Sequence, residues 1–256
     1  MSYKNGRLPI KWKIALIVPV SKGYGDYRPI SLTSCLCKCM VRLILNKLIY
    51  VVGDQLPPNL FGFIKGKSSS HCVIKVLSNF DAKCRVFIDL KGAFDRANSQ
   101  VILEELVGKG IKGKLLQRIE SYPSGRKAKV LFQGHTSEDM DLELGTPQGG
   151  VLSPFLFNIL MDKTARHDFP GGTQIILYAD DIVIQYVNAC VMKAALAQLQ
   201  NLCLYTRLVI NEHKSKCQTQ AVDSGFVING KELEKVNSYK YLGIFTGFNK
   251  NHDEIC

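Results

Sequence analysis

The chain has 256 residues, of which 46% are hydrophobic and 21% are charged, a composition that can build a folded core. Disordered, collagen-like and low-complexity classes are therefore excluded, and the length predicts one large domain or two closely packed lobes. Lys and Arg outnumber Asp and Glu by 33 to 22. The resulting formal charge of +11 favours a polyanionic partner, either nucleic acid or an anionic membrane surface.

Neither a membrane span nor a secreted protein is predicted. The longest early apolar run, Ile14–Val20, contains Pro19 and is far shorter than the roughly 18 residues that cross a bilayer. No small-residue cleavage pattern follows it. The 9 cysteines form no CxxC motif and have no histidine at zinc-finger spacing, so we expect small buried hydrophobic residues in a reducing, intracellular compartment.

In the first part of the chain we expect a strand at Ile14–Val20, then a basic loop, then a helix over residues 34–51. The apolar face predicted for this helix has a spacing close to 3.6 and consists of Leu36, Met40, Leu43, Ile44 and Leu48. A buried strand, Val86–Leu90, then precedes a helix with a predicted face of Ile102, Leu103, Leu106 and Val107.

Later elements follow the same alternation of strands and helices. A strand is expected at residues 129–133, and Ser153 with Pro154 is typical of a helix start, predicting a helix to about Thr164. Two β-rich runs, 174–178 and 182–186, predict a hairpin with acidic residues at its tip. A helix near residues 191–206 and a strand pair formed by 216–219 and 239–245 complete a mixed α+β fold.

Three aspartates lie at strand ends. Asp89 follows an apolar strand, and Asp180 with Asp181 occupies the turn of the predicted hairpin. Ionised carboxylates gathered in one place are unfavourable unless a cation compensates them, and oxygen ligands favour Mg²⁺ or Mn²⁺ over zinc. Two-metal phosphoryl transfer is the chemistry that such sites serve, whereas the alternative for each aspartate is a solvated turn residue.

The sequence around these aspartates resembles a known family. Tyr178-Ala179-Asp180-Asp181, the run Gly145–Pro154 and the run Phe87–Asp95 resemble, in order and spacing, a reverse transcriptase of the non-LTR retrotransposon (jockey-like) type. Further resembling blocks cover nearly the whole chain: Asp26–Leu32, Phe61–Phe63, Ile210–Ser215 and Tyr239–Gly243.

The resemblance implies RNA-templated DNA synthesis, with two Mg²⁺ or Mn²⁺ ions held by the three aspartates. One ion would activate a primer 3′-hydroxyl for attack on the α-phosphate, and the other would neutralise the departing pyrophosphate. Asp89 and Asp180 are expected to carry most of the coordination, and Asp181 less. RNA template, DNA primer and dNTPs are the partners expected.

The resemblance also assigns substrate contacts. Phe94 corresponds to an aromatic residue beneath the sugar of the incoming nucleotide, where it disfavours a 2′-hydroxyl, although it could be only a core residue. Gln148, in a turn with Gly149 and Gly150, would contact the nucleotide or templating base. The triphosphate candidates are Arg28 and Lys22, whose alternative is a solvated surface cation.

One lysine is a candidate proton donor. Lys214 resembles the lysine that protonates the leaving pyrophosphate, with Lys216 as the competing assignment and a plain surface lysine as the alternative.

Nucleic-acid contacts are expected from basic clusters and from one hairpin. The basic candidates suit phosphate backbones rather than base edges and predict salt-sensitive binding that is independent of sequence: Lys65, Lys67, Arg126, Lys127 and Lys129. The Tyr239–Gly243 hairpin, with Tyr241, Leu242 and Gly243 as candidate contacts, resembles the segment that grips the primer terminus in this family.

The expected architecture is that of a right-hand polymerase. Fingers interleaved with the palm are expected over residues 1–84, a palm over 85–247 with a fingers-like insertion near 112–144, and a tail over 248–256. The palm is expected to be a ferredoxin-like antiparallel sheet with helices on one face. Few residues follow Gly243, so we expect the helical thumb of the family to be missing from this chain, and no endonuclease or RNase H segment is recognised.

Two other functions are weighed. A non-catalytic, truncated relic that binds nucleic acid is compatible with a missing thumb, although the intact aspartates argue against it. An RNA-dependent RNA polymerase shares the palm chemistry, but Tyr178-Ala179 before the acidic pair and Phe94 favour deoxynucleotides.

Overall fold

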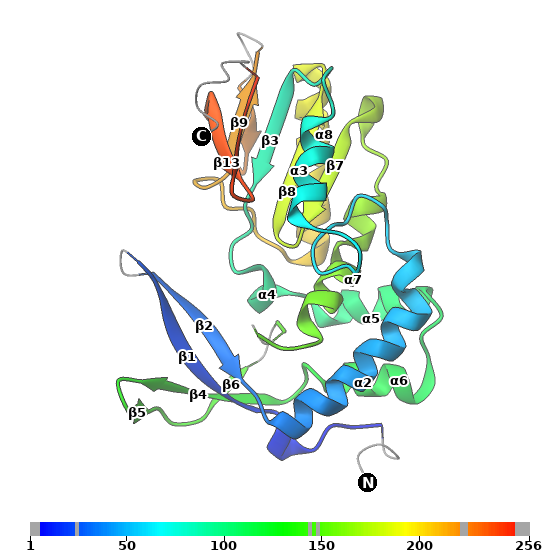
Figure 1. The fold of residues 1–256 in the computed structure, drawn as a ribbon, viewed down its shortest axis with the longest axis vertical. Coiled ribbons are helices and arrows are strands. Elements are labelled where there is room, and N and C mark those ends of the chain that lie inside the picture. Colours follow the sequence, from blue (N-terminus) through cyan, green and yellow to red (C-terminus); the bar gives the residue numbers. More distant parts are fainter. Residues whose placement is uncertain (1–5, 24–25, 143–144, 147–148, 221–224, 249–256) are drawn as a thin grey trace. The chain divides into compact units, whose positions relative to one another are not determined.

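The computed structural model describes residues 6–23, 26–142, 145–146, 149–220 and 225–248 (Figure 1). Two compact units make up the fold: Met1–Leu56 with Phe94–Leu160, and Pro57–Ala93 with Met161–Cys256. Both contain helices and strands, so the predicted mixed α+β class is confirmed. Among the described residues, no helix is long and apolar enough to span a membrane.

The sheet of the first unit runs in the order β2-β1-β4-β5, and β6 also pairs with β4. Its strands are β1 (Ile14–Gly23), β2 (Asp26–Leu32), β4 (Arg126–Phe132), β5 (His135–Thr136) and β6 (Met140–Leu142). Strand β2 occupies part of the predicted basic loop, so that prediction is wrong. Because β2 lies at the edge of the sheet, it tolerates Pro29, which weakens the strand pattern in the sequence.

The helices of the first unit are α2 (Cys35–Val52), α5 (Ser99–Gly108) and α6 (Gly113–Ser121). The position of α2 is as predicted, but its predicted face is only partly right: Ile44 and Leu48 are buried, whereas Leu36 and Leu43 are 65% and 63% exposed. The buried residues of α2 are Cys37, Val41, Ile44, Leu45, Leu48 and Val52. Since α2 carries apolar residues on two adjacent stripes, periodicity alone could not select the buried one. In α5, Val107 is likewise exposed.

Two further helices each contain residues of both units: α4 (Ala93–Arg96) and α7 (Ser153–Arg166). Helix α7 begins at Ser153 with Pro154 next, which confirms the predicted start. Three short 3₁₀ segments complete the helical elements: η1 (Ile10–Trp12), η2 (Gly53–Gln55) and η3 (Pro170–Gly172).

The second unit is built on a sheet in the order β12-β9-β3-β8-β7. Its strands are β3 (Cys84–Ile88), β7 (Gln174–Tyr178), β8 (Asp181–Tyr186), β9 (Lys216–Thr219) and β12 (Glu234–Lys235). The predicted hairpin is confirmed as β7 and β8, which pair in antiparallel fashion. Strand β3 lies between β8 and β9 and is antiparallel to both.

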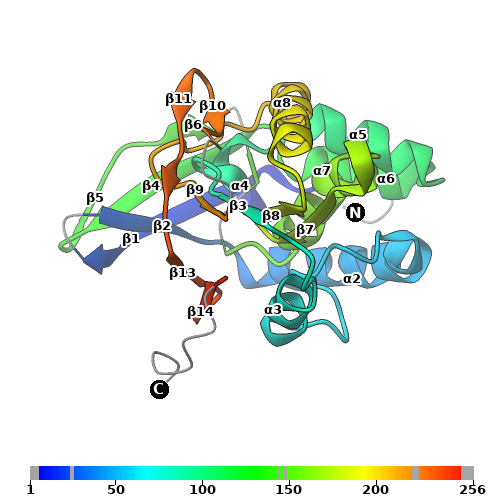
Figure 2. The same cartoon turned by 90° about the horizontal axis from the view of Figure 1, so that it is seen from above.

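Helices cover both faces of this sheet, so the expectation of helices on one face is wrong. Helices α3 (Ser69–Leu77) and α8 (Ala189–Thr206) lie on opposite sides of β3, β8 and β7 (Figure 2). Every residue of β3 is buried, which requires cover on both faces. On the α3 side, a cluster packs around Phe87 and Val183: Phe61, Cys72, Val73, Val76, Ile176 and Tyr241.

The boundary between the units also differs from the expected one at residues 84 and 85. The Phe61 amide N–H donates to the Leu177 carbonyl at 2.8 Å, and the Leu177 N–H donates to the Asn59 carbonyl at 3.0 Å. The segment Asn59–Phe61 therefore extends the sheet beside β7, and α3 completes the core beneath it. Residues 57–84 belong to the second unit for this reason, and the first unit takes 94–160 rather than 112–144.

Two hairpins end the described chain, β10 (Val227–Ile228) with β11 (Lys231–Glu232), and β13 (Ser238–Tyr241) with β14 (Ile244–Gly247). The predicted pairing of 216–219 with 239–245 is wrong, because β13 pairs with β14, and β9 pairs with β3 and β12. Leu242 and Gly243 both have positive φ, 46° and 90°, as a two-residue hairpin turn requires.

Candidate active site

Strand register brings the three aspartates to one end of the second unit's sheet. Ile88 lies opposite Ile182, so Asp89, the next residue after β3, is adjacent to Asp181 at the start of β8. Side chains alternate between faces along a strand, which places Asp89 on the face of Phe87 and Asp181 on the face of Val183. The carboxylates therefore continue the apolar cluster beneath α3.

The turn that carries Asp180 is backed by a glycine. Tyr178 pairs with Asp181, leaving Ala179 and Asp180 as a two-residue turn in which Ala179 has φ 55°. A Cβ atom on Gly62 would lie 2.5 Å from the Ala179 backbone nitrogen. Only glycine permits this approach between the loop and the turn. In the sequence, the only sign of this close approach is a glycine between two aromatic residues, Phe61 and Phe63.

The pKa of Asp181 reflects both its burial and the proximity of the other two carboxylates. Burial, and after it the negative charges of Asp180 and Asp89, together raise its pKa from the ordinary value to about 6. Loss of hydration penalises the charged form, and like charges add to the penalty. The three side chains therefore form one electrostatic cluster that a cation would relieve.

The donor set suits a divalent cation that completes its coordination with substrate. Within the described residues, no group of three or more carboxylate, imidazole or thiol side chains is gathered closely enough to hold a metal ion alone. Mg²⁺ is commonly bound by one or two carboxylates, with water and substrate phosphates filling the other positions. Three aspartates, which offer only oxygen ligands, fit that mode rather than a closed protein cage.

The raised pKa of Asp181 predicts that Asp181→Asn stabilises the metal-free chain at neutral pH. A carboxyl group whose pKa is higher in the folded state opposes folding once it ionises, so the penalty is absent below about pH 4 and complete above about pH 6. We expect a gain of about 1 kcal/mol at pH 7.5 after solvent screening, or roughly 2–4 °C in Tm.

Thermal unfolding with EDTA at pH 4 and pH 7.5 measures this gain. Asp81→Asn, a change to an exposed carboxylate of the same unit, is the matched control and should leave Tm unchanged at both pH values. An equal effect of Asp181→Asn at the two pH values would contradict the electrostatic origin of the penalty.

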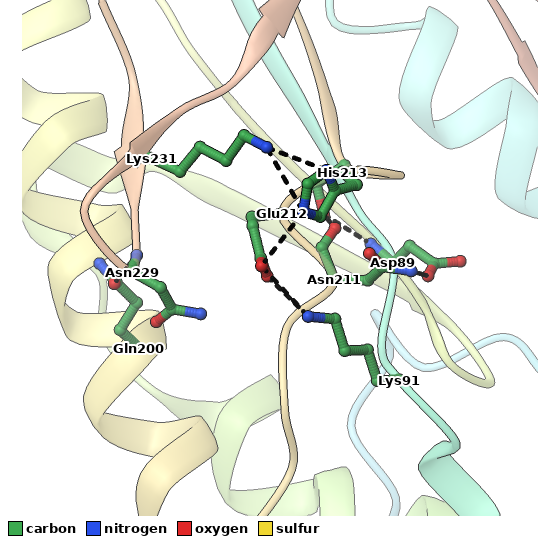
Figure 3. A network of polar contacts seen from close by, with 9 residues as sticks. Asp89, Lys91, Gln200, Asn211, Glu212, His213, Asn229 and Lys231 are labelled. Carbon is green, nitrogen blue, oxygen red and sulfur yellow. Dashed lines mark hydrogen bonds and ion pairs between the residues drawn. The ribbon is translucent and has the colours of Figure 1, made fainter.

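Asp89 is held by the turn that follows α8 (Figure 3). The Asn211 side-chain amide donates to Asp89 Oδ2 at 3.0 Å, and the Asp89 N–H donates to Ser215 Oγ at 3.1 Å. Lys214, the predicted proton donor, is exposed on the same turn. Its rival Lys216 is engaged elsewhere, because its ammonium contacts the Glu234 carboxylate and the His213 carbonyl.

The predicted sugar contact lies in the first unit. The Phe94 ring is half-buried and packs against Phe157, with ring centroids 4.9 Å apart. The Thr146 N–H donates to the Phe94 carbonyl at 2.8 Å, and a Cβ on Gly145 would lie 2.5 Å from the Asp95 carbonyl oxygen. The glycine-rich loop is thus anchored to the backbone at Phe94.

Of the other nucleotide contacts predicted, Gly149 and Arg28 are exposed, Arg28 on β2. Gln148 and the Lys22 side chain lie outside the described part of the chain.

Two basic residues predicted to contact nucleic acid donate hydrogen bonds within the protein. Lys67 Nζ donates to the carbonyls of Pro58 at 2.7 Å and Leu60 at 2.6 Å, and burial lowers its pKa. Arg126 is 2% exposed and donates to the Tyr122 carbonyl at 3.2 Å, so it cannot reach a phosphate backbone. Lys67 braces the loop before α3 and stays a predicted contact, whereas Arg126 belongs to the core of the first unit and its predicted contact is corrected.

The remaining predicted contacts divide between exposed and buried positions. Lys65 and Lys127 are exposed, and Lys127 Nζ lies 4.0 Å from Asp141 Oδ1. Tyr241 is 3% exposed and its hydroxyl lies 3.3 Å from Cys72 Sγ, so its predicted contact with a primer is wrong. Gly243, at the hairpin tip, is exposed, and Leu242 is half-buried.

Tyr239 lies near the carboxylates, although the sequence singled out only its segment, the hairpin Tyr239–Gly243. Its ring stacks on Phe87 with centroids 4.3 Å apart. Burial raises the pKa of its hydroxyl, and the charges of Asp181 and Asp89 raise it further. The sequence does not show which residue of this hairpin lies beside the carboxylates.

The sheet of the second unit thus carries one aspartate after a central strand and two more at the adjacent hairpin. The chain belongs to the reverse transcriptase (RNA-dependent DNA polymerase) family, whose sequence profile matches residues 20–245. This confirms the resemblance found in the sequence.

Relatives by sequence come from insect retrotransposons. The chain is 32% identical over 268 aligned positions to a probable RNA-directed DNA polymerase from transposon BS of Drosophila melanogaster, with 92% of this chain and 30% of the relative aligned. It is 30% identical to the RNA-directed DNA polymerase from mobile element jockey of Drosophila funebris, with 86% and 26% aligned. The chain thus spans less than a third of these relatives.

Solved structures with a similar fold include telomerase from Candida tropicalis in complex with a fragment of telomeric RNA. The TM-score is 0.65 at 13% identity, and the match covers 98% of this chain and 46% of the telomerase chain. A truncated apo form of the same telomerase gives a TM-score of 0.63. At this identity the likeness shows the fold alone.

Proposed function

We propose that this chain is the catalytic core of an RNA-directed DNA polymerase of a non-LTR retrotransposon, joining dNTPs to a primer 3′-hydroxyl on an RNA template. The observation that carries the proposal is the shared electrostatic cluster of Asp89, Asp180 and Asp181 at one sheet end. Family membership and the names of the relatives support the same reaction.

In this proposal the second unit is the palm and the first unit contributes the fingers. The strand order β9-β3-β8-β7 supports a ferredoxin-like palm. The net charge of +11 supports binding of RNA template and DNA primer through their phosphates. The free thiols of the eight described cysteines suit a reducing, intracellular setting.

The residues of the chain have separate roles in the reaction. Asp89 and Asp180, with Asp181, would hold two Mg²⁺ or Mn²⁺ ions. When bound, such ions lower the pKa of the attacking hydroxyl and neutralise charge on the phosphates. Lys214 supplies a proton to the leaving pyrophosphate from its exposed position on the turn after α8. Arg28 and Lys22 bind the triphosphate, and Gln148 and Gly149 contact the nucleotide.

Primer extension tests the proposal. The purified chain is incubated with an oligo-dT primer on poly-rA, dTTP, and Mg²⁺ or Mn²⁺, and extension is followed on a gel. Extension that stops on addition of EDTA supports the proposal. Salt-sensitive binding of the primer–template without extension under either metal would favour a non-catalytic nucleic-acid-binding relic instead.

Phe94→Ala is expected to relax sugar selectivity. The half-buried ring would disfavour a 2′-hydroxyl by steric conflict, so its removal should raise rNTP use relative to dNTP use by about 10-fold or more. The ratio of kcat/KM for UTP and dTTP measures the effect.

Phe132→Ala is the matched control, because Phe132 is 44% exposed on β4 of the same unit. It should leave the ratio unchanged. An unchanged ratio for Phe94→Ala as well would assign Phe94 to packing against Phe157 alone.

A further inference from the structure

Asp89 is tied to one turn at three of its atoms. The Asn211 N–H donates to the Asp89 carbonyl oxygen at 2.8 Å, and the Asn211 side-chain amide donates to Asp89 Oδ2 at 3.0 Å. The Asp89 N–H in turn donates to Ser215 Oγ at 3.1 Å. Both the backbone and the carboxylate of Asp89 are therefore fixed by the Asn211–Ser215 turn (Figure 3).

The turn is itself internally braced. Asn211 offers its carbonyl oxygen to Ser215 Oγ at 2.8 Å, to the Ser215 N–H at 2.9 Å and to the Lys214 N–H at 3.2 Å. Ser215 is fully buried. These bonds close a ring in which Asp89 binds Ser215, Ser215 binds Asn211, and Asn211 binds Asp89. A ring of this kind holds its members more rigidly than separate hydrogen bonds would.

Residues next to Asp89 and next to Asn211 in the sequence also contact each other. The Lys91 N–H donates to the Val209 carbonyl at 2.8 Å, and the Lys91 ammonium lies 2.9 Å from Glu212 Oε2. Residues 89–91 and 209–212 therefore run as a short paired segment beyond the end of β3. Figure 3 shows Asn211 directed at Asp89 and Glu212 directed at Lys91 from this segment.

We propose that Asn211 is a positioning residue for the reaction centre, acting through Asp89. The amide donates to Oδ2 and fixes the plane of the carboxylate, which leaves Oδ1 to bind a divalent cation. Groups that hold a metal ligand in place commonly change metal affinity by 10- to 100-fold when removed. This inference rests on the proposed function, because it takes Asp89 as a metal-binding residue.

The same ring connects Asp89 to the candidate proton donor. Lys214 lies between Asn211 and Ser215, and its backbone N–H is bound by the Asn211 carbonyl. A single turn thus fixes the backbone of Lys214 and the carboxylate of Asp89. Loss of the Asn211 side chain would loosen only the carboxylate, since the backbone bonds of the turn do not involve that side chain.

The direct test is Mn²⁺ binding to the full chain without nucleotide, measured by electron paramagnetic resonance. Asn211→Ala is expected to weaken Mn²⁺ binding about 10-fold and to raise the metal concentration for half-maximal primer extension by a similar factor. Asn211→Leu keeps a branched side chain of similar shape without the donor, and should give the same loss if Asn211→Ala folds poorly. Circular dichroism checks that each variant is folded.

Glu212→Gln is the matched control, because it alters the same turn and removes the ion pair with Lys91 without contacting Asp89. Its Mn²⁺ affinity should stay within about twofold of the parent, as expected for a partly exposed ion pair. Folded Asn211 variants with the affinity of the parent would overturn the proposal, even if their Tm falls. Asn211-dependent Mn²⁺ binding in a parent chain that extends no primer would instead refute the proposed function and leave the positioning role standing.

Discussion

Asp180→Asn is expected to reduce primer extension by about 10³-fold or more while leaving the fold intact. Asparagine has the same shape as aspartate but lacks the charge, so the two-residue turn between β7 and β8 should persist. What is lost is a negative ligand at the point where the reaction needs a divalent cation, an interaction worth several kcal/mol in the transition state.

Single-nucleotide extension measured under saturating primer–template gives the rate for each variant. Asp181→Asn should reduce the rate less than Asp180→Asn, because the family resemblance assigns Asp181 a smaller share of the metal coordination. Asp168→Asn, a change to an exposed carboxylate of the same unit, should extend at the parental rate. A parental rate in Asp180→Asn would remove this aspartate from the reaction and with it the two-metal mechanism.

The sequence predicted the strand and the hairpin that carry the three aspartates, because local patterns determine these elements. Asp89 follows a short run of apolar residues, and the hairpin that carries Asp180 needs only two β-rich runs and a tight turn. Such elements are specified by neighbouring residues. Their convergence was then an expectation from family resemblance, and the register of β3 against β8 supplies the physical basis for it.

The failed predictions concern residues whose surroundings are set by distant parts of the chain. Arg126 was expected to contact nucleic acid, and charged residues are rarely buried. In the fold, Arg126 is buried and packs over the ring of Tyr122, with its guanidinium carbon 5.4 Å from the ring centroid. Tyr241 was expected at a primer and instead fills the core beside Cys72. No local pattern distinguishes these cases.

The predicted grouping of residues 57–84 with the first part of the chain differs from the structure for a similar reason. Residues 57–84 precede β3 in sequence and were grouped with the basic first lobe. Their place is decided by backbone pairing of Asn59 and Phe61 with Leu177, more than 110 residues further along the chain. Composition cannot reveal such pairing, because the hydrogen-bonding groups are common to every residue.

Gly62→Ala is expected to lower the rate of extension by about 10²-fold with only a moderate loss of stability. The new methyl group would lie 2.5 Å from the Ala179 nitrogen and 3.2 Å from the Ala179 Cα, both backbone atoms. The bond from the Phe61 N–H to the Leu177 carbonyl, at 2.8 Å, keeps the loop from moving away freely. The turn must therefore shift, and Asp180 shifts with it.

A displacement of about 1 Å at a reacting group can reduce a rate about 10²-fold, whereas overpacking costs about 1–3 kcal/mol of stability. Single-nucleotide extension and thermal unfolding measure the two effects separately. Gly108→Ala is the matched control, since a Cβ at Gly108 meets nothing within 4 Å, and it should preserve both rate and Tm. If Gly62→Ala lost stability but kept the parental rate, the turn would tolerate displacement, and the close approach of Gly62 would serve packing rather than the placement of Asp180.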